Sequence, residues 1–188
     1  SQIATFLTDR FGRLSAIAKG AKRAKSATGG ALDMLTLNEI VFAPSRSGGL
    51  ATLREARTVE QFAGLRASTS KYYAGLYVAE LAHVFGEGTE GTDTHLEQTV
   101  LTLRALSSET KNVDNIISYY EGQLLTVAGL APNLCTCGRC GLRPEASGAA
   151  RLSLEDGGIL CRNCPGGVAI SRGSLATLRR IFESSITS

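Results

Sequence analysis

The sequence predicts an α+β protein with a small N-terminal β-barrel of the OB-fold type, a helical region and a four-cysteine module before a last helix. Apolar and polar side chains first alternate, which is the period of a strand. After residue 59 the period becomes that of a helix, and near the C-terminal end four cysteines have the spacing C-x2-C-x20-C-x2-C. The expected segments are a barrel at 1–58, a helical domain at 59–134, a cysteine module at 135–168, and a C-terminal helix packed on the helical domain at 169–188.

The strands of the barrel are predicted in two pairs. Residues 3–19 have the pattern of a hairpin with its turn at 8–12, and residues 34–42 and 50–57 have that of a second pair. Four strands are one fewer than the five of an OB-fold barrel. Because the chain starts at Ser1 inside a strand, we expect the first strand of the barrel to be missing and the chain to be truncated there.

Three helices are predicted to follow. The first places five apolar side chains on one face: Leu65, Tyr72, Leu76, Ala79 and Val84. A second is expected from about residue 93, and a third over 113–127, where Gly129 and Pro132 would end it. Three amphipathic helices can bury a common core. A last helix is predicted over 171–185.

The cysteines are the clearest sign of a bound ligand, and the pattern consists of Cys137, Cys140, Cys161 and Cys164. Two residues between thiolates let one tight turn present both sulfurs to one metal ion, and two such turns complete the tetrahedral shell that Zn²⁺ favours. Since four sulfurs leave no open position, we expect one structural Zn²⁺. Gly141 can take a positive φ beside the site. The alternative is two disulfides, and Cys135 is expected to be a bystander or a substitute for Cys137.

Composition and motifs argue against several functions. No apolar run approaches the ~18 residues of a membrane span, and no signal peptide is visible. The cysteine pattern suits a reducing compartment, so a cytoplasmic location is expected. No P-loop, dinucleotide-binding or nucleophile-elbow motif occurs. His83 and His95 are expected to be packed or surface residues. We therefore expect no enzymatic activity; a metal-dependent enzyme would need an open zinc position.

Positive charge gathers near the N-terminus, although the formal net charge is only +3. Within residues 1–30 Asp9 is the only acidic residue, against six cations: Arg10, Arg13, Lys19, Lys22, Arg23 and Lys25. On a hairpin and its following loop these could form a stripe that attracts phosphates through counterion release. Phe11, at the predicted turn, could stack on a base. The alternative is a solvated loop without a ligand.

Several short sequence strings are characteristic when they occur together. They are Phe6-Leu7-Thr8, Phe11-Gly12-Arg13-Leu14, Ala18-Lys19-Gly20-Ala21-Lys22-Arg23, Gly29-Gly30-Ala31-Leu32, Leu35-Thr36-Leu37, Gly129-Leu130-Ala131-Pro132 and Cys140-Gly141. Together with the order of the parts, they resemble the bacterial RecO family of recombination mediators over almost the whole chain. That family normally has a strand before Ile3 and continues beyond the last helix.

The resemblance implies DNA repair by homologous recombination, without bond-making catalysis. RecO-like proteins bind single- and double-stranded DNA, anneal strands coated by single-strand-binding protein, and help RecR to load RecA. The DNA surface would use the six N-terminal cations, and the helical region would hold the C-terminal tail of single-strand-binding protein, with Lys71 and Arg104 as available cations. Such proteins act in the bacterial cytoplasm, on the nucleoid during repair. The alternative is a zinc-ribbon RNA-binding or transcription-associated module.

Overall fold

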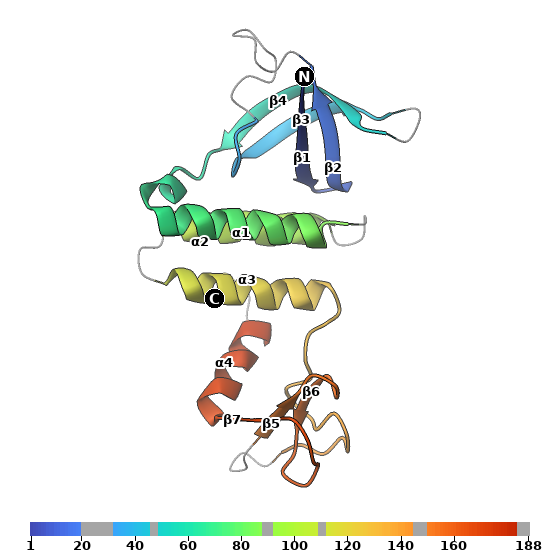
Figure 1. Ribbon diagram of the computed structural model, residues 1–188, viewed down its shortest axis with the longest axis vertical. Coiled ribbons are helices and arrows are strands. Elements are labelled where there is room, and N and C mark those ends of the chain that lie inside the picture. The colour runs from blue at the N-terminus through green and yellow to red at the C-terminus, as the bar shows by residue number, and fades with distance from the viewer. Residues whose placement is uncertain (20–31, 46–48, 88–91, 109–111, 145–149, 184–188) are drawn as a thin grey trace. The chain divides into compact units, whose positions relative to one another are not determined.

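A computed structural model describes residues 1–19, 32–45, 49–87, 92–108, 112–144 and 150–183 (Figure 1). The chain divides into two compact units, residues 1–120 and 121–188. This division is coarser than the four segments expected from the sequence, whose boundaries stay a prediction. The α+β class is confirmed. Among the described residues, no helix is long and apolar enough to cross a membrane.

The first unit begins with a four-stranded sheet. Its strands are β1 (Gln2–Thr8), β2 (Gly12–Ala18), β3 (Leu37–Ala43) and β4 (Ala51–Glu60). β1 and β2 form the predicted hairpin, with Thr8 opposite Gly12. The Thr8 hydroxyl closes the turn, because it donates to the Gly12 carbonyl at 2.9 Å and accepts the Phe11 N–H at 3.0 Å. Gly12 has a φ of 58°, a value that glycine adopts without strain.

The strand order is β1-β2-β4-β3, so β1 and β3 are the edges of this sheet. β3 and β4 are antiparallel, whereas β2 and β4 are parallel, with Ala16 opposite Ala51. A core of four small or branched side chains lies along this parallel pairing: Ala16, Ala18, Ala51 and Leu53. The sheet has two free edges in the part of the chain that is described, and a five-stranded closed barrel stays a prediction.

Three helices complete most of this unit: α1 (Thr69–Phe85), α2 (Thr92–Ser108) and α3 (Val113–Val127), preceded by the 3-10 turn η1 (Ala63–Ala67). Ser68 caps α1, since its hydroxyl accepts the Lys71 N–H at 3.3 Å. The buried core between these helices includes Leu65, Leu106 and Tyr120. The Tyr120 hydroxyl shares a 2.9 Å hydrogen bond with Thr99 of α2, which satisfies both buried groups.

The predicted apolar face of the first helix is partly wrong. β4 continues to Glu60 and Leu65 lies in η1, so α1 starts later than the sequence suggested. Its buried positions are Lys71, Gly75, Val78 and Ala82, whereas Val84 is 59% exposed. Gly75 permits close packing, because a Cβ there would lie 3.0 Å from a methyl group of Leu35 and 3.2 Å from one of Leu65.

The second unit contains the end of α3, a small sheet and the last helix. The sheet has the order β6-β5-β7, from β5 (Ala150–Ser153), β6 (Gly158–Leu160) and β7 (Val168–Ile170), and α4 spans Arg172–Glu183. Gln123 of α3 donates to the Ile181 carbonyl at 2.9 Å. Arg179 of α4 donates to the Leu134 carbonyl at 2.7 and 3.1 Å. These bonds connect α4 to α3 and to the chain that leads into the cysteines.

Candidate nucleic-acid interface and metal centre

The described cations of the basic N-terminal segment lie at opposite ends of one hairpin. Arg10 lies in the turn between β1 and β2, and its side chain is 81% exposed. Lys19 directly follows β2 and is exposed. Because strands rise by about 3.3 Å per residue, the length of β2 separates these two positions by roughly 20 Å. Lys22, Arg23 and Lys25 lie outside the described residues, so a continuous stripe of all six stays a prediction.

Arg13 has protein partners. Its guanidinium forms an ion pair with Glu87 and donates to the His83 carbonyl at 3.0 Å. Its backbone N–H donates to the Gly86 carbonyl at 2.7 Å. The side chain is only 28% exposed. These bonds attach the start of β2 to the end of α1, a structural role that the sequence did not suggest.

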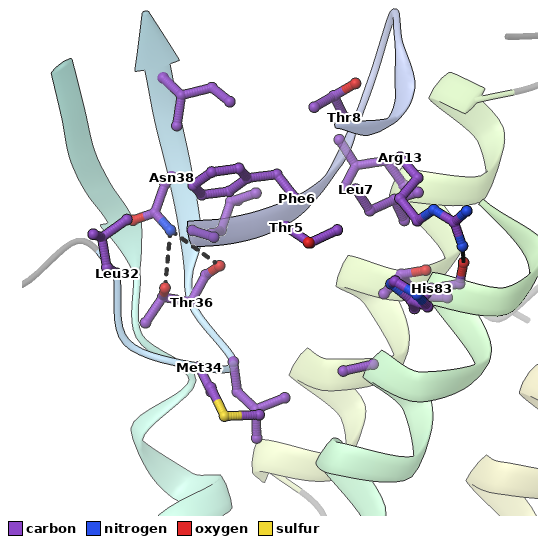
Figure 2. A pocket seen from close by; sticks show the side chains of 18 of the residues that line it. Thr5, Phe6, Leu7, Thr8, Arg13, Leu32, Met34, Thr36, Asn38 and His83 are labelled. Carbon is purple, nitrogen blue, oxygen red and sulfur yellow. Dashed lines mark hydrogen bonds between the residues drawn. The ribbon is translucent and has the colours of Figure 1, made fainter. Parts of the chain in front are cut away.

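A cleft of about 850 Å³ lies between the sheet edges β1 and β3 and the helices α1 and α2. Figure 2 shows Phe6 reaching from β1 toward the strand that carries Asn38. The Asn38 amide nitrogen is bonded to the Thr36 hydroxyl at 2.9 Å, while its oxygen is buried without a partner among the described residues. Phe11 lies at the cleft in edge-to-face contact with Phe42, with ring centroids 5.3 Å apart, and is still 54% exposed. An exposed aromatic ring at the turn could stack on a base.

The four predicted cysteine ligands lie together in the second unit. The sulfur atoms of Cys137, Cys140, Cys161 and Cys164 all lie within 4.8 Å of one another. The Cys140 and Cys161 sulfurs are 3.7 Å apart. A tetrahedral site with Zn–S bonds of about 2.3 Å requires sulfurs about 3.8 Å apart, which this pair matches. Cys135 is exposed and outside this cluster, and no described cysteine forms a disulfide.

The two cysteine turns are fixed by backbone hydrogen bonds. The Cys137 N–H donates to the Leu142 carbonyl and the Gly141 N–H to the Cys137 carbonyl, both at 2.8 Å. Gly141 has the expected positive φ, at 75°. In the second turn, the Cys164 N–H donates to the Cys161 carbonyl at 3.2 Å. These turns orient the four sulfurs toward one another without the help of a metal ion.

Backbone dipoles make one thiol of the quartet unusually acidic. The N–H groups of Cys161, Cys140 and Arg139 lower the pKa of Cys137 to about 6. Burial and the neighbouring cysteines raise the pKa of Cys164 to about 12. Four thiolates this close repel one another, which disfavours their joint ionisation without a cation. A divalent cation can stabilise all four, and the closed sulfur shell fits structural Zn²⁺.

Sequence reasoning missed the polar side chains that surround this quartet. Arg139 lies between two of the four cysteines and forms an ion pair with Asp156, which belongs to the turn between β5 and β6. The visible signal was an arginine inside the string Cys-Gly-Arg-Cys, but its partner, 17 residues later, depends on the folded hairpin.

Comparisons with known proteins cover both units. A family model described as "Recombination protein O N terminal" matches residues 1–62, and one described as "Recombination protein O C terminal" matches residues 66–188. A protein of Rhodopirellula baltica named "DNA repair protein RecO" is 33% identical over 167 residues, which are 87% of this chain and 61% of that protein.

Two further relatives have the same name. The one from Anaeromyxobacter sp. (strain K) is 31% identical over 189 residues, covering 98% of this chain and 74% of its own length. The one from Dehalococcoides mccartyi (strain CBDB1) is 27% identical over 190 residues, covering all of this chain and 74% of its own length. The chain therefore spans about three fifths to three quarters of these relatives.

Proposed function

The chain belongs to the RecO family, and from that premise we propose that it is a DNA-binding recombination mediator acting in DNA repair. Its part is to hold DNA backbones on the N-terminal hairpin and its basic loop, so that complementary single strands can anneal. The observation that carries the proposal is the run of six cations in the sequence of residues 1–30, of which Arg10 and Lys19 are exposed at the two ends of β2, in a chain that the family models match over residues 1–62 and 66–188.

Electrostatics explains how such a surface promotes annealing. Two DNA strands repel each other through their phosphates, and cations on the protein replace the condensed counterions that would otherwise screen this repulsion. Arg10 and Lys19 are exposed and roughly 20 Å apart along β2, which is far enough to contact separate phosphates. Phe11 adds a stacking surface next to Arg10. No sequence preference is expected, because backbone contacts do not read bases.

Salt dependence of DNA binding provides the main test. Replacing Lys19, Lys22, Arg23 and Lys25 together by glutamine should remove up to four phosphate contacts. The slope of log affinity against log salt concentration should then fall by about 3 for single-stranded DNA. Fluorescence anisotropy with a labelled oligonucleotide at several salt concentrations measures this slope.

The matched control removes the same charge elsewhere, by replacing the exposed Arg54, Arg57, Arg143 and Arg162 with glutamine. That variant should bind DNA like the wild type. Equal affinity and slope in both variants would contradict the phosphate surface. A single Arg13→Gln variant should lose stability more than DNA affinity, since the arginine guanidinium forms an ion pair with Glu87 and donates to the backbone carbonyl of His83.

Annealing of complementary strands coated by single-strand-binding protein tests the activity itself. Faster annealing with the wild type than with the four-cation variant supports the mediator role. Strong preference for RNA over DNA, without annealing, would instead favour a zinc-ribbon RNA-binding module. The expected partners are DNA, RecR and the tail of single-strand-binding protein.

Two helical cations that could contact that tail already have partners within the protein. Lys71 is buried and its ammonium donates to the Ser107 carbonyl at 3.2 Å, while Arg104 forms an ion pair with Glu60 at 2.8 Å. Binding of the tail through Arg104 would require breaking the ion pair between Arg104 and Glu60. If the tail takes the place of Glu60, Arg104→Gln should reduce the affinity of the protein for the tail.

A further inference from the structure

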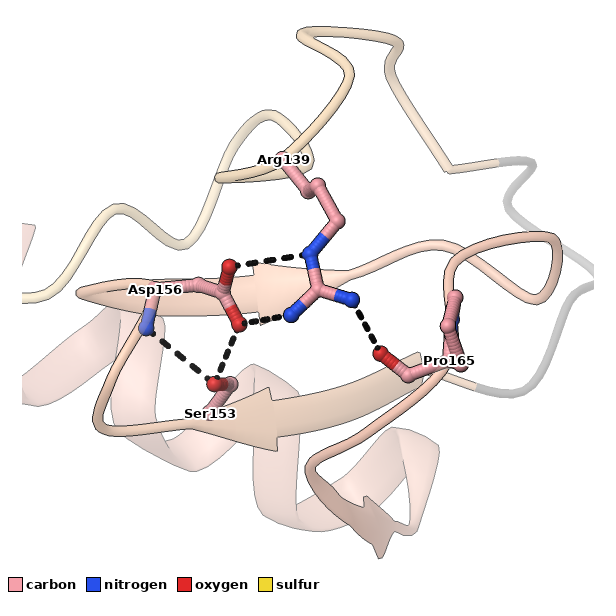
Figure 3. Close-up of polar contacts among 4 residues, drawn as sticks. All are labelled: Arg139, Ser153, Asp156 and Pro165. Carbon is pink, nitrogen blue, oxygen red and sulfur yellow. Dashed lines mark hydrogen bonds and ion pairs between the residues drawn. The ribbon is translucent and has the colours of Figure 1, made fainter.

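One arginine in the cysteine module connects three separate pieces of chain. Arg139 lies in the first cysteine turn, between Cys137 and Cys140. Its Nε and Nη2 atoms donate to the two carboxylate oxygens of Asp156 at 3.1 and 3.0 Å. Its Nη1 atom donates to the carbonyl of Pro165 at 2.8 Å, directly after the last cysteine of the second turn (Figure 3).

The acceptor of this arginine is itself held in place. The Ser153 hydroxyl donates to the Asp156 carboxylate at 2.6 Å and accepts the Asp156 N–H at 3.1 Å. The Asp156 side chain is only 16% exposed, compared with 42% for Arg139. Both oxygens of the carboxylate are therefore fixed, and the two-pronged guanidinium fits them in one orientation.

Backbone packing brings the first turn against the same hairpin. The Gly138 N–H donates to the Ile159 carbonyl at 2.9 Å. A Cβ at Gly138 would lie 2.4 Å from the Asp156 carbonyl oxygen, so only glycine fits this contact. The first cysteine turn thus rests on the β5–β6 hairpin, and Arg139 extends that contact to the far side of the second turn.

This connection matters because each cysteine turn is local, whereas a complete metal site needs both. Twenty residues separate Cys140 from Cys161, and bringing the turns together costs conformational entropy. An arginine bonded to the second turn and to the intervening hairpin restricts that freedom. Its positive charge also suits a site in which four thiolates outweigh the charge of a divalent ion.

We propose that Arg139 is a positioning residue for the metal centre: with Asp156 and Ser153 it holds the two cysteine turns in their metal-binding arrangement and slows release of the ion. It does not touch the metal. This inference concerns retention of the ion and is independent of DNA binding, so either proposal can fail without the other.

Release of Zn²⁺ to a chelator in excess, followed by a colorimetric zinc indicator, tests the proposal in the full chain. Loss of a supporting hydrogen bond around a metal site commonly costs 10–100-fold in affinity, so Arg139→Gln should release Zn²⁺ about tenfold faster. Arg139→Lys keeps the charge but lacks the planar, two-pronged guanidinium, so it should release Zn²⁺ faster than the wild type but no faster than Arg139→Gln. Arg143→Gln removes an exposed arginine of the same segment and should release Zn²⁺ at the wild-type rate.

A double-mutant cycle separates positioning from general destabilisation. If Arg139 acts through Asp156, the double variant Arg139→Gln/Asp156→Asn should release Zn²⁺ much more slowly than the product of the two single-variant accelerations predicts. Ser153→Ala should give a smaller acceleration, since it leaves the ion pair in place. Co²⁺ substitution checks that each variant still forms a four-thiolate site by its absorption spectrum.

Equal release rates in wild type and Arg139→Gln, or independent effects of Arg139 and Asp156, would overturn the proposal. If Arg139→Gln does not bind metal at all, the rates of Ser153→Ala and Asp156→Asn decide it. Faster release from either variant supports the network, and wild-type rates from both refute it.

Discussion

The first unit and the cysteine module of the second are stabilised in different ways. In the first, large side chains such as Leu65, Leu106 and Tyr120 are fully buried between helices. In the module, Ile159 and Leu160 are also fully buried, but the cluster at the cysteines is small and consists of Cys137, Leu160 and Cys161, with Cys164 packed against it. Two of the three members of that cluster, Cys137 and Cys161, belong to the candidate metal site. Burial of apolar surface can therefore maintain the first unit, whereas we expect the module to depend on a metal ion held by the four cysteines.

This difference indicates how far the effect of a mutation or of metal loss should spread through each region. A conventional core distributes its stability over many contacts, so the loss of one contact weakens it gradually. A small metal module concentrates its stability in one ion and a few polar links such as Arg139 with Asp156. Conditions that remove the ion should therefore unfold the module while the first unit stays folded.

The largest expected effect is that of metal removal. Binding of structural Zn²⁺ contributes roughly 10–16 kcal/mol in small zinc domains, so chelation or Cys161→Ser should unfold the cysteine module. Hydrogen exchange followed by mass spectrometry should show loss of protection in β5, β6 and β7, while β1–β4 remain protected.

The reciprocal variant is Leu106→Ala, which removes a fully buried side chain of α2. It should destabilise the first unit by about 2–5 kcal/mol and leave Zn²⁺ content unchanged. Equal loss of protection in both regions after chelation would show that the comparison between them does not hold.

A smaller effect is expected at the contact between α3 and α4. A Cβ at Gly122 would lie 2.2 Å from the Cγ2 methyl group of Ile181, so Gly122→Ala forces the helices apart despite the better helix propensity of alanine. We expect a loss of about 1–3 kcal/mol, seen as faster proteolysis within α4. In an Ile181→Ala background the same glycine substitution should be neutral or stabilising, and a persistent loss there would exclude the clash as the cause.

The smallest expected effect is a pH dependence of the first unit. Burial lowers the pKa of His95 below 6.5, and its Nε2 atom has no partner among the described residues. The unfolded chain then binds the proton more tightly, so stability is complete above pH 6.5 and is lost as the pH falls from there toward the folded-state pKa. Urea denaturation of His95→Gln between pH 5.5 and 7.5 should show a flatter profile than the wild type. His83→Gln, at an exposed position, serves as control, and an unchanged profile in His95→Gln would refute the assignment.

Much of this could be anticipated from local sequence. The α3 bounds and the grouping of the four cysteines were predicted correctly, because helix period, terminating glycine and cysteine spacing are local properties. The burial of α1 was predicted poorly: Val84 is exposed and Lys71 buried, since the partners that decide burial come from η1 and α2. For the same reason the pairing of Arg13 with Glu87, 74 residues later, left no local signal.

The parallel pairing of β2 with β4 has a consequence for how the sheet forms. The β1–β2 and β3–β4 pairs are local in sequence and can close quickly, but an isolated two-stranded hairpin is only marginally stable. Ala16 and Ala18 come from one pair and Ala51 and Leu53 from the other, so the apolar cluster of the sheet exists only after the two pairs meet. The segment between β2 and β4 must be closed before this burial stabilises anything, so docking of the hairpins should limit the folding rate.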